Sequence, residues 1–325
     1  MLARLSPKCR ALRSPIAKTL KGTDVTSPLN WLHISDIHFN PKNEWRDSTT
    51  RETLLEFLAD IFKEDPSLTP DFIFCTGDIA FGESKALSLE KQYIQARDFF
   101  SKLLNVCAKD GVALSIDRLF VVPGNHDVNR DVINTDAQSA LVSLAKEPYI
   151  HHQTINQRFE NRTKEFADAM QRLHHFSQFV KDYLPHQHDD ENRIFFSKKI
   201  KWNGLEIGIS CFNSAWTCSG PEDDRNIWLA GQWQFNKSHK NTSKSCISIG
   251  LIHHPNDWFN LADRDFASKT IPTNFDFWLH GHSHNAWVTP GPNNVTIAAG
   301  AVGAEENDEF GVNITTLDFK KAKGV

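Results

Sequence analysis

The sequence has few of the features that mark secreted, membrane-spanning or polyanion-binding proteins. Its six cysteines form no C-x-x-C pair, and no uncharged apolar stretch approaches the roughly 18 residues of a membrane span. Lys and Arg number 36 against 40 for Asp and Glu, so the net charge of -4 gives no overall attraction for nucleic acid or anionic lipid. We therefore expect a cytoplasmic protein with no membrane partner and no stable nucleic-acid partner. Its cysteines are expected to be free core thiols, with a disulfide between Cys211 and Cys218 as the alternative.

The first 28 residues differ in composition from the rest of the chain. They hold six basic side chains against one acidic side chain, and three prolines interrupt any periodicity. A disordered basic N-terminal extension is expected here, in preference to an organelle-targeting or nucleic-acid-binding arm. The remaining residues, 29–325, are long enough to bury the core of one large α/β domain.

From Trp31 onward, short apolar runs alternate with helical patterns, which is typical of a layered α/β domain. Strands are predicted at 31–35, 72–76, 119–122, 205–212, 246–252, 275–279, 295–299 and 312–317. Helices are predicted from about residue 49, from about 84 to 107 and at 228–239. Two sheets packed face to face, with helices outside, would bury all these strands.

Residues 128–199 interrupt this alternation of short strands and helices. They are polar, rich in histidine and mostly helical, and they are too long for a plain connection. We predict a helical cap insertion at about 128–199 that covers the cleft at one end of the sheet and restricts the size of what can bind there.

Five apolar runs end abruptly in residue types that bind metals. Because the carboxyl ends of strands in an open α/β sheet converge on one crevice, five such endings can meet at one place. The segments are Ile34-Ser35-Asp36-Ile37-His38, Thr76-Gly77-Asp78, Pro123-Gly124-Asn125-His126-Asp127, Ile252-His253-His254-Pro255 and Leu279-His280-Gly281-His282-Ser283-His284.

The ligand types indicate which metals would bind. Asp and Asn oxygens mixed with imidazole nitrogens suit manganese, iron, zinc or nickel better than calcium, and thiolates are absent from all five segments. Asp36 and His38 are two residues apart, so an extended backbone would project both to one side, and His282 and His284 share this spacing. Each motif alone has a plain explanation, such as a surface pair, a turn or a satisfied core histidine. All five motifs in this order have no such plain explanation.

The order of these segments and the residues in them resemble the motifs of the calcineurin-like metallophosphoesterase superfamily, and within it those of the class III cyclic-nucleotide phosphodiesterases. The family motifs are D-x-H, G-D-x-x, G-N-H-D, a strand-terminal H and G-H-x-H, and every one is complete between about residues 31 and 317. The resemblance implies an α/β fold of four αββα layers, a double β-sandwich of the metallophosphoesterase type. It also implies two divalent transition-metal ions, namely manganese, iron, zinc or nickel, with manganese expected in vitro.

The resemblance also implies a ligand set, residue by residue. His253 is preferred to His254 because the family's ligand is the first residue after the apolar strand. The implied ligands are Asp36, His38 and His284 for the first metal, Asn125, His253 and His282 for the second, and Asp78 as the bridge.

Two cations about 3.5–4 Å apart can bind phosphate oxygens and lower the pKa of a bridging water. A metal-bridging hydroxide is then the expected nucleophile, and no covalent intermediate is needed. The resemblance places His126 to protonate the leaving oxygen or to steady the phosphate, and Asp127 to orient it. Phe81 stands where purple acid phosphatases carry an iron-binding tyrosine, so stable ferric iron and low-pH phosphatase activity are disfavoured.

These observations predict a hydrolase of phosphoester bonds, in the first place a phosphodiesterase acting on a phosphoester such as a nucleotide. The alternatives are a phosphomonoesterase or nucleotidase and a nuclease of the same fold, although the balanced charge argues against a wide basic track. A non-enzymatic scaffold would lack ligands, and none is missing. A role as the effector module of a larger signalling or defence system stays open. Five aromatic residues near the motifs can stack on a nucleobase or pack at the sheet rim: Phe39, Trp45, Trp216, Trp258 and Phe259.

Overall fold

The computed structural model describes residues 27–40, 44–144, 148–188, 195–220, 226–303 and 310–319. The predicted basic extension lies outside these ranges except for its last two residues. No helix within the ranges is long and apolar enough to cross a membrane. Cys211 and Cys218 are both buried free thiols, so the disulfide considered as an alternative is wrong.

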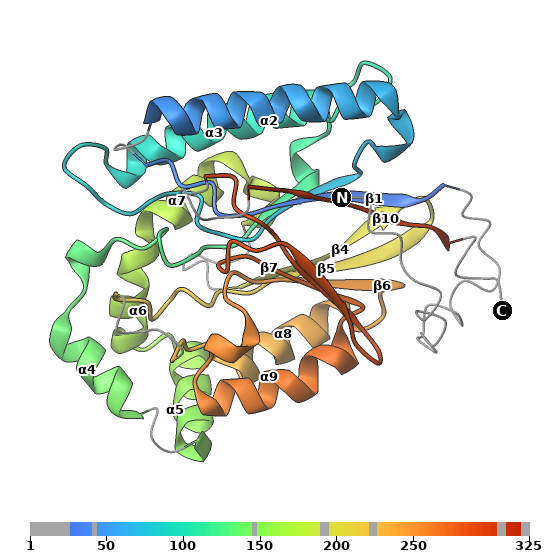
Figure 1. The fold of residues 1–325 in the computed structure, drawn as a ribbon. Helices are drawn as coiled ribbons and strands as arrows, with labels where there is room; N and C mark the ends of the chain where they lie inside the picture. Colours follow the sequence, from blue (N-terminus) through green and yellow to red (C-terminus); the bar gives the residue numbers. More distant parts are fainter. Residues whose placement is uncertain are drawn as a thin grey trace.

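Two mixed sheets form the centre of the fold (Figure 1). The four-stranded sheet has the order β10 (Asn313–Leu317), β1 (Leu29–Ile34), β2 (Phe72–Cys75) and β3 (Leu119–Val121), and only β10 pairs antiparallel. The six-stranded sheet has the order β4 (Phe196–Trp202), β5 (Leu205–Cys211), β6 (Ile247–Leu251), β7 (Phe277–His280), β9 (Val295–Ala298) and β8 (Trp287–Pro290). Its four inner strands are parallel, and β4 and β8 join antiparallel at the edges.

The two sheets pack face to face through apolar side chains that alternate along each strand. Trp31 and Phe74 of the smaller sheet belong to one buried cluster with Ile249 and Phe277 of the larger sheet. The rings of Trp31 and Phe277 meet edge to face, with centroids 5.0 Å apart. This contact fixes the two sheets against each other, so that the ends of their parallel strands share one rim.

Helices cover the outer face of each sheet (Figure 1). The helices α2 (Glu44–Glu64) and α3 (Leu89–Val106) lie on the four-stranded sheet, and α8 (Gly231–Thr242) and α9 (Leu261–Asn274) lie on the six-stranded sheet. The expected four-layer αββα arrangement is therefore confirmed. Ser88 begins α3 by accepting a hydrogen bond from the Lys91 backbone N–H, so this helix starts a few residues later than predicted.

Among the strands and α-helices of the described residues, β4, β8 and α9 have no counterpart among the predictions. All four residues of β8 are exposed, so this edge strand has no inward apolar face that a pattern could reveal. The helix α9 contains Pro272 and buries mainly small side chains. The strand β4 begins at Phe196, inside the segment assigned to the insertion.

The predicted insertion contains the helices α4 (Thr135–Leu144), α5 (Pro148–Asn161), α6 (Lys164–Met170) and α7 (His174–Tyr183). Phe179 of α7 is buried between two tyrosine rings, stacking on Tyr93 at 4.9 Å and on Tyr183 at 5.7 Å between centroids. Gln187 accepts a hydrogen bond from the Val121 backbone N–H and donates one to the Val121 carbonyl, which closes the free edge of β3. The segment is thus packed into the main core, and its effect on substrate size stays a prediction.

Candidate metal centre

The predicted ligands lie on the loops that follow β1, β2, β3, β6 and β7. One ligand atom each from Asp36, His38 and His284 lies within 4.8 Å of the other two, and so does one each from Asp36, Asp78 and His253. Residues more than 240 positions apart in the chain therefore share one site at the common rim of the two sheets. Convergence of the strand ends, expected from the sequence, brings these side chains together.

Five of the nine described non-glycine residues with positive φ are at ligand positions. They are Asp36 (φ 53°), His38 (φ 51°), Asp78 (φ 49°), His282 (φ 70°) and His284 (φ 52°). Left-handed backbone is uncommon for such residues and is kept where the surrounding structure enforces it. The expected extended backbone at the Asp-x-His and His-x-His pairs is therefore wrong, because each pair converges through two left-handed turns.

Glycine at position 124 permits the close approach of the loop after β3. A Cβ atom at Gly124 would overlap the Asp78 carboxylate, so only glycine lets this backbone pass beside that side chain. The His126 backbone N–H, two residues further on, donates to Asp78 Oδ1 at 2.8 Å. Asp78 is thereby oriented by the loop that carries the predicted ligand Asn125.

The first ligand set consists of Asp36, His38 and His284. His284 Nε2 lies 3.3 Å and His38 Nε2 lies 3.6 Å from the same carboxylate oxygen, Asp36 Oδ1. Among the described residues, this buried oxygen and His38 Nε2 have no partner with hydrogen-bond geometry. Donor atoms that face one another at such separations are spaced like the ligands of a single cation. The His282 backbone N–H fixes the other carboxylate oxygen, Asp36 Oδ2, at 3.1 Å.

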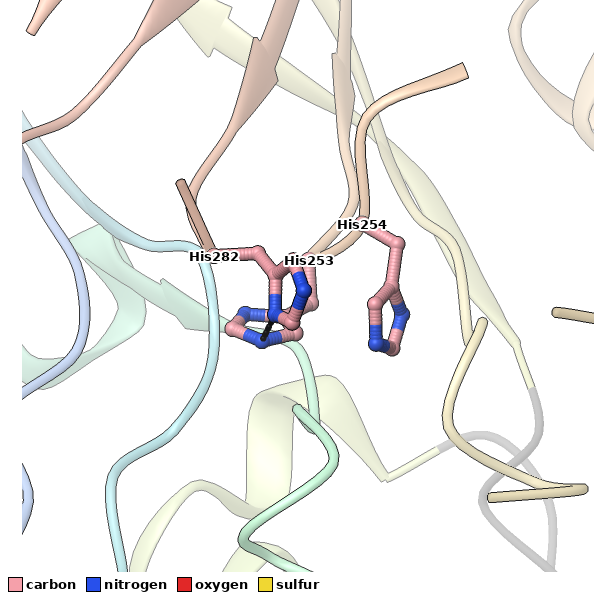
Figure 2. Close-up of side chains that lie close together, drawn as sticks. All are labelled: His253, His254 and His282. Carbon is pink, nitrogen blue, oxygen red and sulfur yellow. Dashed lines mark hydrogen bonds between the residues drawn. The ribbon is translucent and has the colours of Figure 1, made fainter. Parts of the chain in front are cut away.

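The second ligand set is centred on His253, which is fully buried. Its Nε2 atom lies 3.1 Å from Asn125 Oδ1. The same atom lies 3.2 Å from His282 Nδ1 (Figure 2). Two imidazole nitrogens on one tetrahedral zinc ion would lie about 3.3 Å apart. His253 Nδ1 donates to the Thr76 carbonyl at 2.7 Å, which fixes the ring and directs Nε2 toward the other ligands.

Asp78 lies between the two sets. Its Oδ2 atom is 3.6 Å from His38 Nε2 and 3.3 Å from His253 Nε2. One carboxylate oxygen therefore faces a ligand of each set, which fits the predicted bridging position.

The buried carboxylates create a strongly negative potential at the site. Burial would raise the pKa of Asp36, but the imidazoles of His284 and His38 hold that pKa well below its usual range. Burial would lower the pKa of His253, but the charge and hydrogen bond of Asp78 raise it to about 9. Burial and the neighbouring His253 lower the pKa of His282 to about 3. Carboxylates that draw a proton onto one imidazole attract a divalent cation by the same force, so these residues fit a pair of metal ions.

His126 and Asp127, the residues predicted to assist catalysis, have different surroundings. The half-buried His126 ring lies 4.9 Å from the His38 ring between centroids and stacks on Phe81 at 5.0 Å. Its Nδ1 atom lies 3.3 Å from the Phe81 carbonyl, which orients the ring. Burial lowers the pKa of His126, and the charge of Asp78 partly offsets this effect.

Asp127 makes no direct hydrogen bond to the His126 ring, so its orienting role stays a prediction. Its fully buried carboxylate accepts hydrogen bonds from the backbone N–H groups of Ala80 at 2.9 Å and Gly124 at 2.9 Å. The Tyr93 hydroxyl donates to the same carboxylate at 2.8 Å. Asp127 therefore ties together the loops that carry Asp78 and Asn125.

Two further side chains, those of His254 and Trp258, lie beside the predicted ligands. His254 is buried and offers a nitrogen within 4.8 Å of nitrogens of His253 and His282. The half-buried Trp258, in the short 3-10 helix η8 (Asn256–Trp258), packs edge to face on His282 at 4.1 Å between centroids. This contact packs Trp258 against the sheet rim, and stacking of its ring on a nucleobase stays a prediction.

Comparison with known proteins found one family and several similar chains. A family model described as calcineurin-like phosphoesterase matches residues 29–286. The uncharacterized metallophosphoesterase-like protein YydB of Bacillus subtilis (strain 168) is 24% identical over 266 residues, which are 79% of this chain and 49% of that protein. The chain thus spans just under half the length of this curated relative.

Solved structures with similar folds include a dimetal phosphatase from Danio rerio, with 12% identity and a TM-score of 0.45 over 90% of this chain and 93% of that chain. They also include a phosphopantetheinyl hydrolase from Mycobacterium tuberculosis, with 11% identity and a TM-score of 0.42 over 90% and 97% of the two chains.

Proposed function

The chain belongs to the calcineurin-like phosphoesterases, a family of metal-dependent phosphoester hydrolases, and from this premise we propose that it is a dinuclear phosphodiesterase. The proposed ligands are Asp36, His38 and His284 for one divalent transition metal, Asn125, His253 and His282 for the other, and Asp78 for both. His126 is the proposed general acid.

The observation that carries this proposal is the position of His126. Its ring borders the ligand His38 and is partly exposed, whereas the ligands Asp36, Asp78 and His253 are almost completely buried. The Phe81 carbonyl accepts a hydrogen bond from His126 Nδ1, so Nε2 is the nitrogen available to a substrate. A leaving oxygen held beside the metals would be within reach of this nitrogen.

Two bound cations would neutralise the phosphate charge and activate the attacking water. The residues of the chain supply the rest of the reaction. The general acid is the imidazolium form of His126, which carries a proton on each ring nitrogen. As the bond between phosphorus and the leaving oxygen breaks, it gives its Nε2 proton to that oxygen and keeps the Nδ1 proton that it donates to Phe81, so that an alcohol departs in place of an alkoxide. A diester of an ordinary alcohol needs this proton more than an activated aryl ester does, which favours phosphodiesters as substrates.

The test is the replacement His126→Ala, assayed over diesters with leaving groups of increasing basicity. We expect alkyl and nucleoside diesters to be hydrolysed about 10²-fold more slowly or worse, and a nitrophenyl diester to be affected less. His186→Ala is the matched control, because His186 is also half-buried and also contacts a backbone carbonyl, that of Leu119, at 2.9 Å. Metal content should be unchanged in both variants.

Two results would contradict the proposal. Equal slowing across the leaving-group series would show that His126 binds the phosphate without donating a proton. Faster turnover of a phosphomonoester or nucleotide than of any diester would replace the phosphodiesterase assignment by a phosphatase or nucleotidase.

A further inference from the structure

His254 is a third imidazole at the second ligand set. Its ring centroid lies 4.7 Å from that of His253 and 4.7 Å from that of His282. One nitrogen from each of the three rings lies within 4.8 Å of the other two. Figure 2 shows the His254 ring beside the His253 and His282 pair, with its edge toward them. Three imidazoles grouped in this way have the composition of a three-histidine metal site.

The outer side of the His254 ring is anchored by Ser214. His254 Nδ1 and Ser214 Oγ are 2.7 Å apart, and both side chains are buried. Ser214 lies on a loop after β5 that the buried Gln234 of α8 braces, since Gln234 accepts from the Asn213 N–H and donates to the Asn213 carbonyl, both at 2.9 Å. Ligating histidines usually donate their second nitrogen to such a partner, which fixes the tautomer and raises the basicity of the first. In the His254 tautomer that carries its proton on Nδ1 and donates it to Ser214, Nε2 keeps its lone pair for a metal.

Burial excludes a direct role for His254 in substrate binding. The residue is 1% exposed, so its ring cannot reach a phosphoester in solvent, and the groups it faces are His253 and His282. An imidazole in this position has either a packing role or a ligand role.

We propose that His254 is a further ligand of the second metal position, which together with His253 and His282 makes that position selective for zinc or nickel over manganese. The inference rests on the two-metal site of the proposed function and adds the identity of one metal. Imidazole nitrogens suit zinc and nickel, whereas carboxylate and carbonyl oxygens suit manganese. With Asp78 shared, the first position would have two carboxylates and two imidazoles. The second would have one carboxylate, the Asn125 amide oxygen and three imidazoles, so it is richer in nitrogen donors and the two positions would hold a mixed metal pair.

The test measures metal binding directly. Metal-free protein is titrated calorimetrically with zinc and with manganese in the presence of a competing chelator, for the wild type, His254→Gln and Ser214→Ala. We expect His254→Gln to weaken zinc binding at one position by about 100-fold and Ser214→Ala by about 10-fold, the span seen when histidine ligation or its support is disturbed. Manganese should bind His254→Gln with less loss, because glutamine offers an amide oxygen.

Cobalt substitution gives a second readout. The visible absorption of bound Co(II) depends on its ligands, so it should change in His254→Gln and stay the same in His186→Gln, a control remote from the metal centre. Unchanged zinc affinity and an unchanged cobalt spectrum in His254→Gln would overturn the assignment and leave His254 a packing residue. If His254→Gln does not fold, unchanged zinc affinity in Ser214→Ala overturns it instead. Neither readout uses hydrolysis, so loss of the phosphodiesterase assignment would be seen separately.

Discussion

The replacement Tyr93→Phe should destabilise the protein although it removes one oxygen atom and no ring. The Tyr93 hydroxyl, on α3, donates to Asp127 Oδ1 at 2.8 Å, and the two residues are 4% and 0% exposed. Burial raises the pKa of Asp127 to about 6, so the ionised carboxylate depends on its donors. Removal of the strongest side-chain donor therefore acts on a group that water cannot reach.

The magnitude follows from the kind of hydrogen bond. A hydrogen bond to a charged acceptor contributes about 1.5–3 kcal/mol, so we expect a loss of about 2 kcal/mol in the free energy of unfolding. The matched control is Tyr183→Phe, which deletes a hydroxyl that lies 2.9 Å from Ser101 Oγ in an exposed contact. Both tyrosines stack on Phe179 and both replacements keep the ring, so ring packing is preserved in each variant. The control should lose about 0.5 kcal/mol.

Urea unfolding of the metal-free proteins, followed by circular dichroism, gives both values. Equal losses in the two variants, or a loss below about 0.5 kcal/mol for Tyr93→Phe, would show that the hydrogen bond to Asp127 does not stabilise the fold. Metal affinity provides a second measurement, because Asp127 also holds the backbone of Ala80 and Gly124 beside the ligands. We expect Tyr93→Phe to weaken metal binding up to about 10-fold, with no change in Tyr183→Phe.

Two further predictions follow from packing. Gly281→Ala should abolish metal binding at the first set, since a Cβ atom there would overlap Ser35 Oγ and lie 2.7 Å from Asp36 Oδ2. The control is Gly311→Ala, where no atom lies within 4 Å of the added Cβ. Tight metal binding in both variants would refute the argument. Deletion of 150–185 should unfold the protein, because it removes buried phenylalanines such as Phe176 and Phe179 that each contribute about 3–5 kcal/mol. Soluble, metal-binding protein after the deletion would show instead that the segment is a cap that the core does not need.

Much of the fold could be predicted from the sequence because its strands are short apolar runs with a clear beginning and end. The runs at 72–76 and 246–252 correspond to β2 and β6, and the metal-binding residue types follow the parallel strands directly. Elements at the margin of the fold could not be predicted in this way. The exposed strand β8 has no buried face, so its pairing with β9 depends on backbone hydrogen bonds that leave no mark on the residue pattern.

The contacts that distinguish neighbouring residues could not be predicted from the sequence. His253 and His254 are adjacent and chemically identical, and only the fold shows that one contacts Thr76 and the other Ser214. The same applies to His126 and Asp127. Spacing predicts that Asp127 lies near His126, but its carboxylate turns to Tyr93, which is 34 positions away and reached only through the packing of α3.

The backbone at the ligands shows why spacing alone misjudged the local geometry. In an extended strand, Asp36 and His38 would point to one side without strain, yet both have left-handed φ, a state that costs about 1–3 kcal/mol for a residue other than glycine. The loop stays in this state because the Asp36 N–H donates to the Gly77 carbonyl at 3.0 Å and the His38 N–H donates to the Asp78 carbonyl at 3.1 Å. These bonds join the ligand loop of β1 to that of β2, so the ligands of one strand are shaped by its neighbour. A site built this way requires both loops at once, which is why its five motifs are informative together and weak when taken singly.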